Sequence, residues 1–266
     1  MYNINNGLLE YITNNFLTEV WQAQTLFLAF VVISIAAAYL LGSVNSAIII
    51  SKVFYGDDIR KYGSGNAGLT NMLRTYGKKA ALFTLLGDIL KTALAIAVTG
   101  ILLGFHYQHG MSLDDGYCYM AGLFAVVGHV FPIYYKFKGG KGVLATATMA
   151  LILTPIPFAI LILLFIAIVY MSRYVSLGSV IVAVLYPVLV NGYIRFVTGS
   201  AAPGILSLCT IVLAIFIVWC HRGNLERISK RTERKISFGG GKKERIGQEE
   251  SAEEDEKSVG GNEDDE

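Results

Sequence analysis

Long apolar runs separated by short polar segments make up most of this chain. The runs occupy residues 25–50, 80–105, 117–135, 143–171, 176–191 and 203–220. A helix needs about 20 apolar residues to cross the hydrocarbon core of a bilayer. The run 143–171 is too long for one untilted helix and contains Pro155 and Pro157, so we expect two shorter helices that turn at 154–157. The pattern predicts an all-α polytopic membrane protein with seven transmembrane helices.

The distribution of Lys and Arg predicts the orientation of these helices. Six basic residues lie in 52–79 and none in 106–116. Cytoplasmic segments carry the excess of basic residues in membrane proteins. The lysines of 136–141, Arg173 and the basic cluster 222–235 reach the same side as 52–79 if 143–171 forms two helices. We therefore expect an external N-terminus and a cytoplasmic C-terminus, with Arg195 in an external loop.

The two ends of the chain differ from the membrane region. Residues 1–23 contain no Lys or Arg, unlike a cleaved signal peptide, and 8–21 is amphipathic enough to lie along the interface. We expect an N-terminal interfacial segment (1–23), a seven-helix membrane domain (24–221), a basic segment (222–238) and an acidic tail (239–266). The low complexity and the many carboxylates of the tail predict disorder.

Composition limits the remaining classes of function. Apolar residues make up 54% of the chain and charged residues 16%, and the net charge of +2 arises because basic loops and the acidic tail nearly cancel. Cys118, Cys209 and Cys220 have no metal-ligand spacing, so they are expected to be small hydrophobic residues. The bilayer is the expected partner, and no metal, cofactor or nucleic acid is expected.

The segment 61–79, KYGSGNAGLTNMLRTYGKK, is expected to form a glycine-rich cationic loop. Its glycines allow positive φ, so that backbone N–H groups can converge on an anion, and Arg74 offers a fork suited to a phosphate. The spacing Gly63-x-Gly65-x-x-Gly68 also fits a dinucleotide fingerprint, but the flanking sequence lacks the required strand. The charges alone fit a basic inner-leaflet loop, whereas the glycine, serine and asparagine content favours an anion site.

A second segment, GHVFPIYYKFKGGKG at 128–142, repeats this chemistry. It is not a Walker A loop, because Gly142 follows Lys141 where Ser or Thr is required. His129 can be a buried core residue or part of the site. Asp88 and Lys91 share a helix face in the run 80–105, either as a structural ion pair or as a lining of the site.

The order of these motifs resembles the bacterial acyl-phosphate:glycerol-3-phosphate acyltransferase family. GSVNSA at 42–47 is followed by DIRKYGSGNAGLTNMLR, GHVFPIYYKFKGGKG and HRGNLERISKRTE, so that the resemblance covers about residues 30–235. It implies a seven-helix enzyme of the bacterial inner membrane with a cytoplasmic active site. Such an enzyme transfers an acyl chain from acyl phosphate to the 1-hydroxyl of sn-glycerol 3-phosphate, giving lysophosphatidic acid and phosphate. The HxxxxD pattern of other acyltransferases occurs from His109 to Asp114, and we interpret it as chance because the segment is expected to be external.

Carried over by position, the resemblance assigns a serine and an arginine to the first motif, a glycine–lysine phosphate loop, a serine after the fifth helix, and a C-terminal His and Asn. The residues expected to be catalytic are Ser64, Arg74, Lys141, His221 and Asn224. The residues expected to bind substrate or phosphate, some from their chemistry alone, are Gly63, Gly65, Asn66, Gly68, Thr70, Asn71, His129, Lys138, Gly139, Gly140, Gly142 and Ser176. Leu69, Leu144 and Arg231 depart from the family pattern without removing a polar site residue.

The sequence leaves alternatives open for the reaction mechanism and for the class of protein. Lys, Arg and backbone N–H groups would hold both phosphates while the glycerol hydroxyl attacks the acyl carbonyl. The resemblance implies that the leaving phosphate accepts the proton, and His221 or His129 as a protein base is the alternative. A transporter or scramblase of a phosphorylated metabolite or lipid is the competing function, although the chain shows no paired inverted repeats. A non-catalytic membrane scaffold is a third reading.

Overall fold

The computed structural model describes residues 7–104, 107–108, 111–112 and 116–236. The chain divides into two compact units. The first comprises Met1–Asn45 and Gly87–Phe238, and the described part of the second is Ser46–Leu86. The acidic tail and the His109–Asp114 pattern lie outside the described residues.

Helices account for most of the described chain. The first unit contains α1 (Gly7–Phe16), α2 (Val20–Ser43), most of α5 (Lys78–Leu103), α6 (Tyr117–Val130), η2 (Ile133–Tyr135), α7 (Val143–Leu153), α8 (Pro155–Ser172), α9 (Val175–Thr198), α10 (Gly204–Cys220) and α11 (Arg222–Ser229). The second contains α3 (Ser46–Tyr55), η1 (Ile59–Lys61), α4 (Leu69–Tyr76) and the start of α5. Two short strands, β1 (Tyr107–Gln108) and β2 (Met111–Ser112), pair antiparallel in the segment predicted as a loop.

Apolar helices of membrane-spanning length confirm the predicted class. Among the described residues, five helical segments are long and apolar enough to cross a membrane. They are Val20–Tyr55, Lys78–Leu103, Tyr117–Tyr135, Pro155–Ser172 and Val175–Thr198. Helices α10 and α11, bent by 52°, give a sixth candidate, and α7 is a shorter apolar helix. The all-helical membrane architecture is therefore confirmed, whereas the number seven and the orientation stay predictions.

The predicted break within 143–171 is confirmed. Helix α7 ends at Leu153 and α8 begins at Pro155. Proline is tolerated at the first helical position, because the N–H group that it lacks has no partner inside the helix. The single residue between the helices, Thr154, is buried and donates its hydroxyl to the carbonyl of Ala150 at 3.0 Å.

Three predicted boundaries were wrong. The run 25–50 is broken at 44–45, where α2 ends and α3 has not begun. Helix α9 continues to Thr198, so Arg195 lies in its last turn and not in a loop. The segment 61–79 is not one loop, because Leu69–Tyr76 form α4, whose apolar residues recur at helical spacing.

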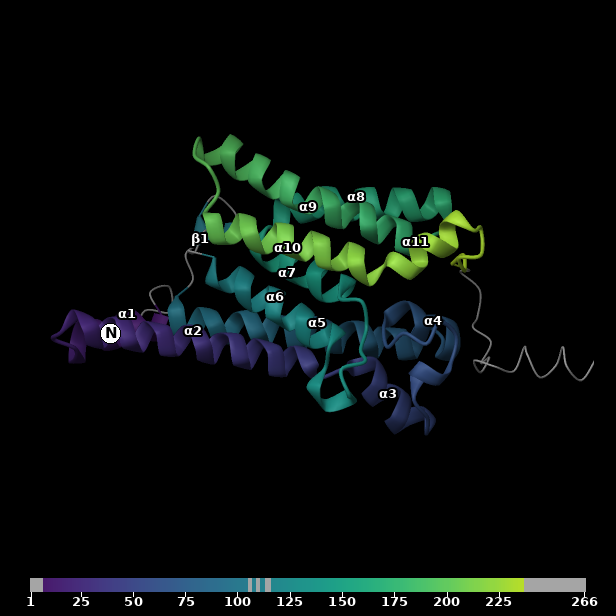
Figure 1. Ribbon diagram of the computed structural model, residues 1–266, viewed down its shortest axis with the longest axis horizontal. Coiled ribbons are helices and arrows are strands. Elements are labelled where there is room, and N and C mark those ends of the chain that lie inside the picture. The colour runs from purple at the N-terminus through teal and green to yellow at the C-terminus, as the bar shows by residue number, and fades with distance from the viewer. Residues whose placement is uncertain (1–6, 105–106, 109–110, 113–115, 237–266) are drawn as a thin grey trace, which may run out of the picture. The chain divides into compact units, whose positions relative to one another are not determined.

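Small residues bring α2 and α6 of the first unit together (Figure 1). A Cβ atom on Gly42 would overlap the backbone of Ala125, and one on Gly128 would overlap the carbonyl oxygen of Tyr39. Membrane helices commonly use glycine and alanine to approach this closely. A larger side chain at Gly128 would therefore separate the two helices.

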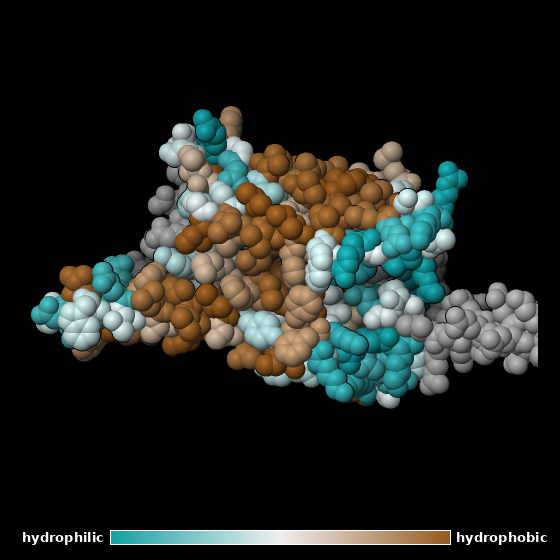
Figure 2. Space-filling model, in the orientation of Figure 1, coloured by the Kyte–Doolittle hydropathy of each residue, from teal (hydrophilic) through white to brown (hydrophobic). Residues whose placement is uncertain are grey.

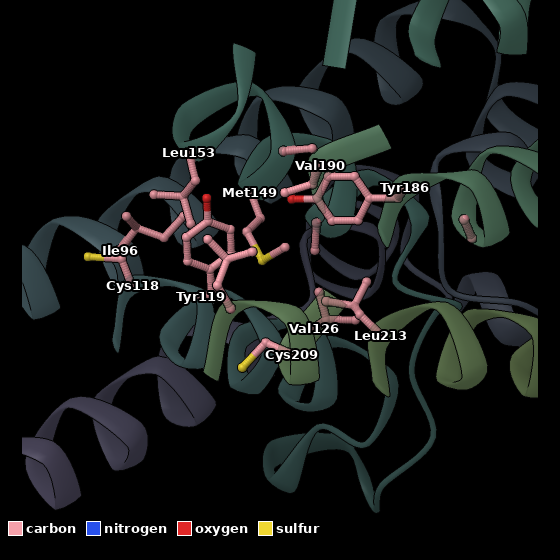
Figure 3. Close-up of a cluster of buried hydrophobic side chains, with 14 of the residues drawn as sticks. Ile96, Cys118, Tyr119, Val126, Met149, Leu153, Tyr186, Val190, Cys209 and Leu213 are labelled. Atoms are coloured by element: carbon pink, nitrogen blue, oxygen red, sulfur yellow. The ribbon is translucent and has the colours of Figure 1, made fainter. Parts of the chain in front are cut away.

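The main apolar core of the first unit lies between α6, α7, α9 and α10 (Figure 3). Tyr119, Met149 and Leu213 are fully buried within it. Cys118 and Cys209 are buried in the same core, which confirms them as small hydrophobic residues. Figure 2 shows apolar side chains covering the outer faces of α8 and α10, as expected for surfaces in contact with lipid.

Candidate active site

A connected hydrogen-bond network joins the loop before α7 to the C-terminal segment of the first unit. The ammonium of Lys141 donates to Asn224 Oδ1, and Asn224 Nδ2 donates to Glu233 Oε1 at 2.6 Å. Ser176 Oγ donates to the same carboxylate oxygen at 2.8 Å. Arg227 Nε donates to the other oxygen, Oε2, also at 2.8 Å. Two predicted site residues, Ser176 and Asn224, thus contact one carboxylate, and a third, Lys141, is linked to it through Asn224.

Glu233 is the residue that the sequence analysis missed. Its side chain is only 8% exposed. Burial raises the pKa of this carboxyl, but hydrogen bonds from Asn224, Ser176 and Arg227 outweigh burial, so the pKa lies below its ordinary value. The carboxyl is therefore ionised at neutral pH. A signal was present, because Glu233 is the one acidic residue in the basic run 228–235, ISKRTERK.

The glycine–lysine loop (Lys138–Gly142) is anchored to the end of α6. Gly139 N donates to the carbonyl of Val130, and Gly140 N donates to the carbonyl of His129, both at 3.1 Å. A Cβ atom on Gly139 would overlap the His129 carbonyl oxygen, so only glycine fits there. These two N–H groups bind helix carbonyls and so hold the loop, and the phosphate-binding role expected of Gly139 and Gly140 stays a prediction. Lys138 is exposed, and Gly142, with a φ of 79°, is the cap residue before α7.

His221 occupies the bend between α10 and α11 and is buried. Its Nδ1 atom lies 2.8 Å from the carbonyl oxygen of Ile217. A carbonyl oxygen only accepts hydrogen bonds, so Nδ1 carries the proton and the neutral ring keeps Nε2 as an acceptor. The structure therefore gives His221 the tautomer that a general base at Nε2 requires.

His129 belongs to a different, buried cluster. Lys91 Nζ lies 2.9 Å from Asp88 Oδ1 and 2.9 Å from His129 Nδ1. The predicted pairing of Asp88 with Lys91 is confirmed. His129, which was predicted to bind substrate, lies in this buried cluster: its ring is enclosed beside α5 and its Nδ1 atom lies against Lys91 Nζ.

Asn71 organises the glycine-rich segment of the second unit. Its Oδ1 accepts from Ser64 N at 3.0 Å, and its Nδ2 donates to the carbonyls of Tyr62 at 2.9 Å and Ile59 at 3.3 Å. The side chain is buried, and a Cβ atom on Gly63 would overlap its Oδ1. The Asn71 side chain thus holds the fold of this segment, and the phosphate-binding role expected of it stays a prediction.

Two carboxylates hold the start of the same segment. Asp58 accepts from Arg60 Nε at 2.9 Å and Nη2 at 2.7 Å, and it caps η1 through Arg60 N. Burial raises the pKa of Asp58, but the Arg60 hydrogen bonds outweigh it and the pKa lies below its ordinary value. Asp57 accepts from the Tyr62 hydroxyl at 2.7 Å and pairs with Lys61. These contacts fix the chain that leads into Gly63.

The remaining predicted residues of the second unit occupy positions consistent with a surface site. Ser64 is exposed, and Arg74 is partly exposed in the last turn of α4. Gly63 and Gly65 have φ values of 57° and 70°, and Gly68 precedes α4. Asn66 and Thr70 are partly exposed. The grouping of these residues with Lys141 and Asn224 in one site stays a prediction.

The chain is similar to known proteins over the region that contains these residues. The family profile described as glycerol-3-phosphate acyltransferase matches residues 32–231. The chain is 42% identical over 203 residues to a glycerol-3-phosphate acyltransferase of Bacillus cytotoxicus, covering 76% of this chain and 92% of that protein. The corresponding protein of Bacillus subtilis is 39% identical over 204 residues, covering 77% and 96%.

Solved structures show the same likeness. A crystal structure of PlsY (YgiH), an integral membrane glycerol 3-phosphate acyltransferase, in its glycerol 3-phosphate form is similar with a TM-score of 0.66 and 30% identity. The match covers 78% of this chain and 96% of that one. The lysophosphatidic acid form of PlsY is similar with a TM-score of 0.64 and 29% identity, covering 78% and 95%.

Proposed function

The chain belongs to the glycerol-3-phosphate acyltransferase family, and we propose that it transfers an acyl chain from acyl phosphate to the 1-hydroxyl of sn-glycerol 3-phosphate. The products are 1-acyl-glycerol 3-phosphate (lysophosphatidic acid) and inorganic phosphate, and the pathway is phospholipid biosynthesis. The similar PlsY structures in glycerol 3-phosphate and lysophosphatidic acid forms support the acceptor and the product. The chemistry of the site supports the donor.

The network around Glu233 carries the proposal. Because the Glu233 carboxylate accepts a hydrogen bond from Asn224 Nδ2, the amide oxygen of Asn224 is turned toward Lys141. Ser176 is held by the same carboxylate. An ammonium placed in this way can attract a phosphate and stabilise the charge that develops as phosphate leaves. A donor whose leaving group is itself anionic suits such a site.

The reaction needs no covalent enzyme intermediate. The glycerol hydroxyl oxygen attacks the acyl carbonyl carbon, and the bond from that carbon to the phosphate oxygen breaks. The phosphate leaves with the electron pair and takes up the hydroxyl proton. The protein contributes by holding both phosphates in place and by stabilising the negative charge.

The two histidines differ in their suitability as an alternative proton acceptor. Lys91 can only donate, so His129 Nδ1 accepts from it and the proton of the neutral ring resides on Nε2. His129 therefore has no nitrogen left to accept a substrate proton. His221 keeps Nε2 for this purpose, so it is the residue to test if the phosphate does not take the proton.

We also propose that the protein crosses the bacterial inner membrane seven times, with its active site on the cytoplasmic face and its N-terminus outside. The positive-inside rule and the confirmed break at Thr154 support this topology. In a cysteine-free variant, single cysteines at positions 66, 138, 174 and 225 should react with an impermeant thiol reagent only from the cytoplasmic side. A cysteine at 197 should react from outside. Labelling of 138 and 174 from opposite sides would contradict the topology.

Substitutions at the network test the enzyme assignment. Purified wild type should form lysophosphatidic acid from palmitoyl phosphate and glycerol 3-phosphate, and Lys141→Ala should lose about 2–4 kcal/mol of transition-state stabilisation, as for loss of a close charged partner. Lys230→Ala is the matched control, because Lys230 is an exposed lysine paired with Glu226 on the surface of the same unit. Equal activity of Lys141→Ala and Lys230→Ala would contradict the site assignment.

A transport assay separates the competing function. Wild-type protein in sealed vesicles should catalyse acyl transfer without uptake of glycerol 3-phosphate. Uptake without formation of lysophosphatidic acid would support a transporter and contradict the proposed reaction.

A further inference from the structure

Lys91 connects three helices at a buried point of the first unit. Its Nζ atom lies 2.9 Å from Asp88 Oδ1 within α5, 2.8 Å from the carbonyl oxygen of Val44 after α2, and 2.9 Å from His129 Nδ1 in α6. The side chains of Asp88, Lys91 and His129 are 2%, 5% and 4% exposed. An ammonium has three N–H donors, so these three acceptors use its full capacity.

The cluster does more than neutralise a charge. Bringing an Asp and a Lys out of water is unfavourable, and well-packed apolar residues of similar volume are often at least as stable. Intramembrane ionisable residues are therefore candidates for a function. Asp88 alone would neutralise Lys91, yet the ammonium also bonds to backbone after α2 and to a ring in α6. Those two additional bonds fix the positions of elements outside α5.

The glycine–lysine loop is bonded to the residue that Lys91 contacts, His129. Helix α6 ends at Val130, and the carbonyls of its last turn lack intrahelical donors. The carbonyls of His129 and Val130 accept instead from Gly140 N and Gly139 N, both at 3.1 Å. Lys141 is the next residue along the chain. The position of His129 therefore determines where Lys141 can lie.

The end of α2 is also bonded to the turn that follows α6. Besides the bond from Lys91 to Val44, Ile133 N donates to Ser43 Oγ at 3.4 Å, and the Tyr39 hydroxyl donates to the carbonyl of Phe131 at 2.9 Å. Lys91, in the middle of α5, thus lies where the ends of α2 and α6 are connected by hydrogen bonds.

We infer that Lys91 is a positioning residue: through His129 and Val44 it fixes the end of α6, and through that end it fixes the glycine–lysine loop that carries Lys141. The part of this inference that concerns catalysis rests on the proposed function of Lys141 in phosphate binding. Lys91 itself does not contact the substrate. The ring of His129 serves as its acceptor.

Two substitutions of His129 separate positioning from a general structural role. The amide oxygen of asparagine is bonded to Cγ, as Nδ1 of histidine is, so His129→Asn can keep the acceptor for Lys91. His129→Leu fills similar space without an acceptor. The double variant Asp88→Asn with Lys91→Met removes both ions together, so that neither is left buried without its counter-ion. Met149→Ala, a truncation in the main core, is the control for lost stability.

Two readouts are measured on each variant in detergent or nanodiscs. We expect His129→Leu and the double variant to raise the KM for a phosphate substrate at least tenfold with kcat changed less than threefold. Hydrogen–deuterium exchange should also increase in 131–142 and not in 175–198. His129→Asn should stay within threefold of wild type in KM. Met149→Ala should lower Tm without changing KM or exchange in 131–142.

Unchanged KM and unchanged exchange in His129→Leu or in the double variant would overturn the inference. An equal rise in KM in Met149→Ala would also overturn it, because lost stability would then suffice. If only one of the two disruptive variants folds, that variant decides by the same two readouts. Hydrogen–deuterium exchange can be measured on a protein without enzyme activity. If the wild type did not transfer acyl groups, the proposed function would be wrong. Exchange in 131–142 would still decide whether the cluster of Asp88, Lys91 and His129 fixes the loop.

Discussion

Replacing Glu233 by alanine should strongly lower the activity of the protein while leaving its membrane region folded. The carboxylate accepts hydrogen bonds from Ser176, Asn224 and Arg227. Hydrogen bonds to charged groups contribute about 1.5–3 kcal/mol each, whereas an exposed ion pair contributes about 0–1 kcal/mol. Arg227 is 46% exposed, so its pair with Glu233 should contribute only as much as an exposed ion pair. Ser176 and Asn224 share one oxygen, so their contributions are not additive, and the loss should be about 2–3 kcal/mol.

That loss acts on catalysis through Asn224. Without the carboxylate, the Asn224 amide is no longer turned toward Lys141, and a loss of 2–3 kcal/mol corresponds to a decrease of about 30- to 150-fold in kcat/KM. Glu233→Gln keeps the shape and one oxygen acceptor but loses the charge, so we expect a decrease of about tenfold. The assay is steady-state formation of lysophosphatidic acid from palmitoyl phosphate and glycerol 3-phosphate. Thermal unfolding in detergent should show a folded protein in each case.

Glu226→Ala is the matched control for this prediction. Glu226 lies in the same C-terminal segment, but its pair with Lys230 is about two thirds exposed on both sides, 65% and 66%. Removing such a pair should cost less than about 1 kcal/mol, so activity should fall no more than about fivefold. Activity of Glu233→Ala within threefold of wild type, or an equal loss in Glu226→Ala, would refute the reasoning.

Four further outcomes follow from the contacts described above. Asn71→Ala should lower the free energy of unfolding by about 2–3 kcal/mol, because it leaves backbone groups of its segment without hydrogen-bond partners. Thr70 is partly exposed, so Thr70→Ala should change that free energy by less than about 1 kcal/mol. Thermal unfolding measures both variants. Gly128→Val should separate α2 from α6 and lower Tm by more than Gly192→Val, where no atom lies within reach of the added carbon. The contribution of Glu233 to stability should be fully present above the ordinary carboxyl pKa of 4.5 and be lost as pH falls through its lowered pKa. The difference in stability between wild type and Glu233→Gln should therefore be constant from about pH 6 to 8 and shrink as pH falls below the ordinary carboxyl pKa. Truncation after Lys243 should leave activity within about tenfold of wild type, since the family match ends at residue 231; a larger loss would assign the tail a role.

The parts of the fold that could be predicted depend on local rules. The apolar runs have the length of membrane helices, and Pro155 cannot continue a helix from Leu153, so the break between α7 and α8 follows from the sequence. Helix ends were harder to predict. Helix α9 continues past Asn191 and Gly192 to Thr198 and ends at the αL cap Gly199.

The site could be predicted as a set of residue types, but not as a set of contacts. Glycine, lysine and asparagine in the motifs indicated phosphate chemistry, yet the polar groups of Asn71, Gly139 and Gly140 are used to fold their own segments. Glu233 escaped prediction because its donors come from the start of α9, from α11 and, through Asn224, from the loop before α7. Such a meeting of distant segments has no signature in a single sequence. An isolated acid in a basic run was the available clue.

The most direct test of the account is the stoichiometry of acyl transfer by the purified wild-type protein. Palmitoyl phosphate and glycerol 3-phosphate should give lysophosphatidic acid and inorganic phosphate in equal amounts, phosphate release should depend on glycerol 3-phosphate, and palmitoyl-CoA should not replace the acyl phosphate. Absence of lysophosphatidic acid, or equal use of palmitoyl-CoA, would contradict it.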